Sequence, residues 1–146
     1  MQVVKALEQI LADSYALYFK TQNYHWNVEG AEFRSLHLMF EGQYEDLAES
    51  LDELAERVRT LGAKVPVLST LIKLASINEP NPNIQASEML KNLVQDQETI
   101  IATLYKGLKI AQAEGDEGTA DMIIGRIKVH EKNKWFLKSS LGHTVA

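Results

Sequence analysis

The sequence of 146 residues contains no cysteine, so it has neither a disulfide framework nor thiolate metal ligands. Glycine and proline number only 8 and 3, too few turn formers for an all-β fold with a turn about every ten residues. No run of eighteen apolar residues occurs, so no membrane span is expected. The first eleven residues carry neither the basic region nor the cleavage site of a secretory signal, and we expect a soluble, cytoplasmic protein.

Basic residues are also fewer than acidic ones: the sequence has 15 Lys and Arg and 20 Asp and Glu, for a formal net charge of −5. A broad nucleic-acid-binding face needs clustered Lys and Arg, so this balance argues against one and makes cations the more natural partners. Hydrophobic residues make up 45% and charged residues 24%, as in ordinary globular proteins. The length predicts a single domain over residues 1–146.

Apolar residues recur every three or four positions in four long segments, the spacing of helices that bury one face. We expect these helices at residues 2–28, 31–61, 87–114 and 119–141. The apolar stripe of the last one is expected to consist of Ile124, Ile127, Phe136 and Leu137. Gly62 and Gly142 stand where helix C-terminal caps are expected.

All three prolines lie in the long connection between Gly62 and Gln85, in which residues 69–75 predict a short helix. Two helices, a long crossover and two more helices form the connectivity of a ferritin-like bundle, whose second and third long helices run parallel. The predicted fold is therefore all-α, a ferritin-like four-helix bundle with a short extra helix in the crossover.

Four potential metal ligands lie on one face of the second predicted helix, within a sector of ~100°, namely His37, Glu41, Asp52 and Glu56. His37 and Asp52 are nevertheless ~22 Å apart along the axis, far beyond the reach of ~2 Å metal–ligand bonds. Either these groups have separate roles, or a two-fold partner runs the same helix antiparallel and brings His37 to the other chain's Asp52 and Glu56. The second alternative places a metal site in a dimer interface, which His25 can join.

Imidazole nitrogens and carboxylate oxygens without sulfur suit ferrous and ferric iron, and they also accept zinc or manganese. A di-iron site within one chain is built instead from Glu-x-x-His pairs on facing helices. The residues three before the four histidines include no carboxylate; they are Gln22, Arg34, Ile127 and Ser140. An intrachain site is therefore disfavoured, and His130 and His143, which have no acidic cluster at ligand spacing, are interpreted as structural.

These residues resemble the ferroxidase signature of the Dps family, the DNA-binding proteins from starved cells. The resemblance rests on His25 followed twelve residues later by His37, and on Asp52 and Glu56 in the motif Asp-Glu-Leu-Ala-Glu-Arg. The motifs Tyr-His-Trp-Asn and Glu-Gly-Asp-Glu-Gly-Thr-Ala-Asp-Met extend it over nearly the whole chain. It implies a hollow shell of twelve subunits that oxidises ferrous iron with hydrogen peroxide, or with dioxygen, and stores the ferric mineral, protecting the cell from oxidative stress.

By this resemblance, one chain supplies His25, His37 and Glu41 to each ferroxidase site, and its partner supplies Asp52 and Glu56. The family often has aspartate at the position of Glu41, so the carboxylate here reaches one methylene further.

The resemblance also implies roles for three more residues. Trp26 resembles the redox-active tryptophan near the iron, and Asp116 and Asp121 resemble the acidic lining of the three-fold pores that admit iron. Simpler interpretations stay open: Trp26 as packing, Asp116 as a helix cap, and Asp52 and Glu56 as a solvated acidic face.

Two other functions are open. One is a nucleoid-associated DNA-binding protein, the activity that gave the family its name. In the family that this chain resembles, lysine-rich extensions usually bind the DNA, whereas Lys5 is the only basic residue among the first eleven residues here. Lys132, Lys134 and Lys138 provide only a weakly basic end, so we expect weak or absent DNA binding. The other is a structural helical oligomer whose metal site is vestigial.

Overall fold

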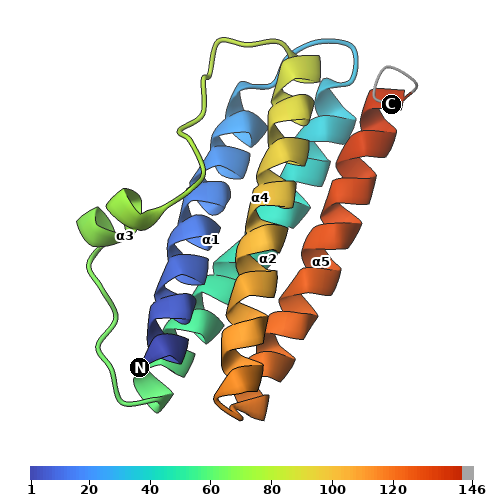
Figure 1. The fold of residues 1–146 in the computed structure, drawn as a ribbon. Helices are drawn as coiled ribbons and strands as arrows, with labels where there is room; N and C mark the ends of the chain where they lie inside the picture. Colours follow the sequence, from blue (N-terminus) through green and yellow to red (C-terminus); the bar gives the residue numbers. More distant parts are fainter. Residues whose placement is uncertain (143–146) are drawn as a thin grey trace.

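The four apolar stripes of the sequence meet in a four-helix bundle, shown by the computed structural model in Figure 1, which describes residues 1–142. The bundle consists of α1 (Gln2–Asn27), α2 (Phe33–Thr60), α4 (Ala86–Ala113) and α5 (Glu117–Leu141). A short helix, α3 (Leu68–Leu74), lies outside it against α1. Every helix begins and ends within two residues of its predicted bounds, and residues 1–142 contain no strand, so the predicted architecture is confirmed.

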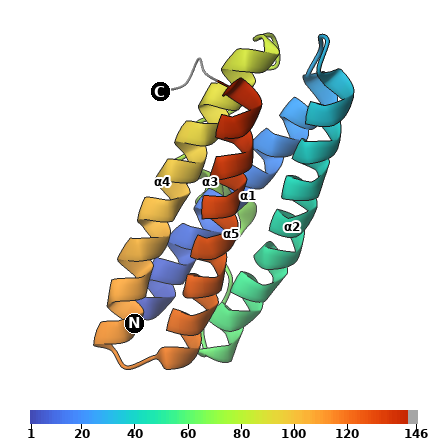
Figure 2. The same cartoon turned by 90° about the vertical axis from the view of Figure 1, so that its right-hand side faces the viewer.

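The crossover between α2 and α4 returns the chain along the length of the bundle, and α2 and α4 therefore run parallel (Figures 1 and 2). Asp13, fully buried on α1, holds this connection in place. Its carboxylate accepts hydrogen bonds from the backbone N–H of Ser76 at 2.6 Å and from the hydroxyl of Thr103 on α4 at 2.7 Å. Gln9 adds a bond from its amide to the carbonyl of Leu74 at 2.8 Å. One face of α1 thus ties the crossover to the bundle.

Gly62 ends α2 as expected, in a backbone conformation that residues with a Cβ atom rarely adopt. Its φ is 95°, and its N–H donates to the carbonyl of Arg59 at 2.9 Å. The N–H of Ala63 donates to the carbonyl of Val58 at 3.2 Å, which completes a Schellman cap.

The expected apolar stripe of α5 is wrong at two of its four positions. Ile127 and Leu137 are buried, but Ile124 and Phe136 are 39% and 42% exposed. The face of α5 that enters the core carries Ala120 and Ile123 instead, together with buried polar residues. Because those polar residues interrupt the apolar pattern, hydrophobic spacing alone does not reveal which face is inward.

The bundle interior contains a network of polar side chains that links three helices. Arg126 on α5 makes a two-pronged ion pair with Asp46 on α2, with N–O distances of 3.2 and 2.9 Å. The Nδ1 atom of His130 lies 2.8 Å from the amide oxygen of Gln97 on α4, so Nδ1 is the protonated nitrogen. Burial, and then the charge of Arg126, lower the pKa of His130 to about 3. His130 is therefore a neutral structural histidine, as expected, whereas His143 lies outside the described residues.

This lowered pKa predicts a loss of stability in mild acid. The unfolded chain protonates His130 below its ordinary pKa of 6.5, whereas the folded chain keeps it neutral down to about 3. Between pH 6.5 and 5 we expect wild type to lose about 1–2 kcal/mol more unfolding free energy than the His130→Gln variant. Urea titrations at several pH values measure this difference, and parallel pH dependences for the two proteins would contradict it.

Candidate metal centre

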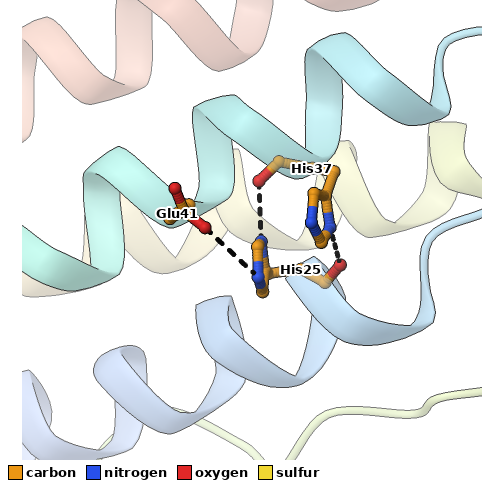
Figure 3. Close-up of side chains that lie close together, drawn as sticks. All are labelled: His25, His37 and Glu41. Carbon is orange, nitrogen blue, oxygen red and sulfur yellow. Dashed lines mark hydrogen bonds and ion pairs between the residues drawn. The ribbon is translucent and has the colours of Figure 1, made fainter.

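Three of the predicted ligands meet where α1 ends and α2 begins (Figure 3). His25 lies in the last turn of α1, and His37 and Glu41 lie one turn apart on α2. One ligand atom from each residue falls within 4.8 Å of the other two. The antiparallel pairing of α1 and α2 thus converts a spacing of twelve residues into a contact.

The two histidines hold each other through reciprocal hydrogen bonds. Nδ1 of His25 lies 2.7 Å from the backbone oxygen of His37, and Nδ1 of His37 lies 2.7 Å from the backbone oxygen of His25. The rings are stacked, with centroids 3.7 Å apart and planes inclined by 14°. These two hydrogen bonds between side chain and backbone fix the relative position of the two helix ends.

The same bonds determine which ring nitrogens can bind a metal. A carbonyl oxygen only accepts hydrogen bonds, so Nδ1 carries a proton in both rings, and Nε2 is the nitrogen through which each ring can bind a metal. Proteins usually orient a histidine ligand in this way, through a hydrogen bond donated by the ring nitrogen that does not bind the metal. The carboxylate of Glu41 lies 3.8 Å from Nε2 of His25. Two imidazoles and one carboxylate therefore face the same point, a donor set that fits iron.

Aromatic rings enclose the protein side of this centre. Phe33 stacks on His37 with centroids 5.0 Å apart, and Tyr44 meets His25 edge-on at 5.1 Å. Burial, followed by the charges of Glu41 and Glu45, raises the pKa of the Tyr44 phenol, so the phenol is neutral near pH 7. Sequence reasoning missed the place of Phe33 and Tyr44 at the site, although their spacings of four and seven residues from His37 put them on its face of α2.

Asp52 and Glu56 do not join this cluster within the chain. Both are exposed on α2, toward its C-terminal end. Asp52 instead borders a surface groove lined by Tyr15 and Tyr18 of α1 and by Leu68 of α3. Among residues 1–142, the cluster able to hold a metal contains only His25, His37 and Glu41. One chain therefore presents three of the five predicted ligands together and two of them apart.

Trp26 follows His25 directly but points away from the bundle core. It is 57% exposed, and no other ring in the described part of the chain contacts it. Packing inside its own chain therefore does not account for this residue.

Asp116 serves as the N-terminal cap of α5, one of the two roles considered for it. Its carboxylate accepts hydrogen bonds from the backbone N–H and the hydroxyl of Thr119, at 3.0 and 2.6 Å, and pairs with Arg57 of α2 at 2.9 Å. The bond from the Thr119 hydroxyl contributes most to lowering the pKa of Asp116, despite an opposing contribution from burial. Asp121, one turn further on, is exposed. The chain therefore commits the first carboxylate to structure and leaves the second free.

None of the helices in the described range, residues 1–142, combines the length and apolar character that crossing a bilayer requires.

Comparison with known proteins places these features in a family context. Residues 4–145 match the family model described as a ferritin-like domain. A low-temperature-induced protein of Nostoc sp. is 43% identical over 94% of this chain and 78% of its own length. DNA protection during starvation protein 2 of Bacillus anthracis is 36% identical over 96% of this chain and 97% of its own.

Among solved structures, the Dps protein of Vibrio cholerae is 35% identical and superposes with a TM-score of 0.91, covering 96% of this chain and 89% of its own. That protein is described as a member of a broad superfamily of ferritin-like diiron-carboxylate proteins.

The contrast between the two aspartates of α5 gives a prediction. Asp116→Ala removes the cap and the partner of Arg57, and we expect it to lower the unfolding free energy at pH 7 by about 1–2 kcal/mol. Because the folded pKa is lowered, this contribution is complete above the ordinary pKa of 3.8 and is lost as the pH falls below it. Asp121→Ala is the matched control and should change stability by less than about 0.5 kcal/mol. Equal effects of the two substitutions in chemical denaturation would refute the assignment.

Proposed function

The chain belongs to the Dps family of ferritin-like proteins, and from that membership we propose that it oxidises ferrous iron and stores the ferric product as a mineral inside a hollow shell. The observation that carries the proposal is the cluster of His25, His37 and Glu41, whose two free Nε2 atoms and carboxylate converge. Dps-type shells of twelve subunits are the proposed assembly, and the cytoplasm is the proposed location.

We propose that a two-fold partner completes each site with its Asp52 and Glu56. α2 is a continuous helix, so its own carboxylates cannot bend back to His37, whereas an antiparallel copy of α2 brings them there. Large apolar side chains on α1 and α3 support a protein-covered face beside these ligands: Tyr15, Phe19, Leu68 and Ile72 are 38%, 49%, 56% and 62% exposed in the single chain. The dimer is thus the smallest unit with a complete site.

Each group then has a defined task. The imidazoles of His25 and His37 bind ferrous iron as a substrate, and the carboxylates of Glu41, Asp52 and Glu56 supply negative charge that favours the ferric product. Hydrogen peroxide takes one electron from each of two ferrous ions and, with two protons, becomes two water molecules. Paired electron transfer releases no hydroxyl radical, which is how the reaction protects against oxidative stress. Dioxygen is the alternative oxidant.

Supporting roles are proposed for three other residues. Asp121 lines the pores and concentrates ferrous ions through its negative charge. Asp116 contributes to the pore chiefly by fixing the start of α5, since Arg57 and Thr119 already engage its carboxylate. Trp26, exposed beside His25, is the proposed redox-active tryptophan.

A structural oligomer with a vestigial metal site is the alternative to an enzyme, and measurements of iron oxidation separate the two. We expect His25→Ala combined with Asp52→Ala to abolish tight ferrous binding in calorimetry and to slow the initial rate of iron oxidation by roughly tenfold or more. Glu53→Ala changes a neighbouring carboxylate on α2 and serves as the control, with wild-type binding and rate. An unchanged rate in the double variant would show that the ligands are misassigned. Stoichiometric iron binding by wild type without turnover would favour the structural oligomer.

DNA binding is the other alternative, and we propose that it is weak or absent. The net charge is −5, and the basic end of α5 is partly engaged: Lys134 lies 4.0 Å from Glu98, and Lys132 lies over the ring of Phe136. We therefore expect no retarded duplex band with sub-micromolar protein at about 0.15 M salt. A clear shift in that gel assay would restore the nucleoid-associated function.

A further inference from the structure

We propose that Tyr44, Tyr18 and Tyr15 form an electron relay that connects the two iron sites of a two-fold dimer. The inference rests on the proposed function, because it assumes an interchain site at which ferrous iron is oxidised.

The three tyrosines form an unbroken series of ring contacts that starts at the metal centre. Tyr44 meets the ring of His25 at 5.1 Å between centroids, Tyr18 meets Tyr44 at 6.0 Å, and Tyr15 meets Tyr18 at 6.3 Å. All three contacts are edge-to-face, with interplanar angles of 67°, 72° and 87°. Electron tunnelling weakens steeply with distance, so rings in direct contact pass an electron far more readily than a single step between the two sites.

The series also leads in the required direction, toward the second site. α1 and α2 are antiparallel, with His25 opposite His37 and Tyr18 opposite Tyr44. The same register places Tyr15 opposite Leu47, midway along α2 between His37 and Glu56. A two-fold axis that brings His37 to the partner's Asp52 and Glu56 crosses α2 at that level. Tyr15 therefore stands near the axis, where the partner's Tyr15 arrives from the other side.

The surroundings of Tyr15 agree with this placement. Its side chain is 38% exposed in the single chain, and together with Tyr18 it lines the groove that Asp52 borders. One groove thus adjoins both the end of the relay and the carboxylate offered to the other site.

Peroxide needs two electrons, and a site that holds one ferrous ion supplies only one of them. The relay provides the second electron. Peroxide bound at one site takes one electron from the ferrous ion there and a second from the ferrous ion of the other site, through the tyrosine rings. Two protons from water complete its conversion to two water molecules, and both irons end as ferric ions. A tyrosine that gives up an electron releases its hydroxyl proton to water, and it recovers both the electron and the proton when the second ferrous ion reduces it, so the rings are unchanged overall.

Tyr18→Phe tests the relay, because phenylalanine keeps the ring and its packing but is far harder to oxidise. The assembled protein is loaded anaerobically with one ferrous ion per site and mixed with one peroxide per two irons. Tyr105→Phe on α4 is the matched control, since Tyr105 is exposed and outside the ring series. Tyr15→Phe repeats the test at a second position, in case Tyr18→Phe impairs assembly. The readouts are ferric absorbance, spin-trapped hydroxyl radical, tyrosyl radical by freeze-quench electron paramagnetic resonance, and ferrous binding by calorimetry.

In wild type and Tyr105→Phe we expect fast oxidation, little hydroxyl radical and a transient tyrosyl signal. In Tyr18→Phe we expect unchanged ferrous binding, a rate reduced by roughly tenfold, and more trapped hydroxyl radical, because peroxide then receives a single electron. A Tyr18→Phe protein that matches wild type in rate and radical yield overturns the relay and leaves the proposed function standing. A wild-type protein that leaves iron unoxidised overturns the proposed function, and the relay with it.

Discussion

The rigidity of one helix is the constraint on which the proposed chemistry depends. α2 carries four potential ligands on one face, but its rise of about 1.5 Å per residue separates the histidine end from the carboxylate end by ~22 Å. No local adjustment of a continuous helix closes such a gap. Under the proposed function, a second copy of the helix closes it, so the ligands belong to an interface. Exposed apolar side chains of α1 and α3, among them Tyr15 and Leu68, line the same groove as Asp52.

Within one chain, the reciprocal bonds between His25 and His37 contribute both structure and chemistry. They join the end of α1 to the start of α2, and they place the protons on Nδ1, which leaves both Nε2 atoms free to bind iron. The bundle interior has a different role. Arg126 and His130 occupy it with hydrogen bonds and an ion pair to neighbouring helices, so its polar groups are used for structure. The division agrees with the missing Glu-x-x-His pairs and with a metal centre at the edge of the bundle.

Much of this could be predicted from the sequence, because the relevant signals are local. Helix periodicity predicted every helix to within two residues. Helix spacing placed His37 and Glu41 on one face, and the resemblance to the Dps family added His25 to them, which is the cluster that the structure contains. Where non-local packing decides, the sequence was insufficient. The inward face of α5 was partly misassigned because Arg126 and His130 interrupt its apolar pattern. The sequence left Asp116 open between a helix cap and a pore residue, and its bonds to Thr119 and Arg57 identify the cap. The places of Phe33 and Tyr44 around the histidines were missed, although the spacing of both residues from His37 puts them on the same face of α2.

The most direct test of a shared site is complementation between two inactive chains. One chain carries His25→Ala and His37→Ala, the other carries Asp52→Ala and Glu56→Ala, and the two are co-expressed with different tags and purified as mixed assemblies. Random pairing makes half of the dimers mixed, and each mixed dimer regains one intact site of two, so about a quarter of the wild-type ferroxidase activity should return. Activity that stays at the level of either variant alone would contradict a site built from two chains.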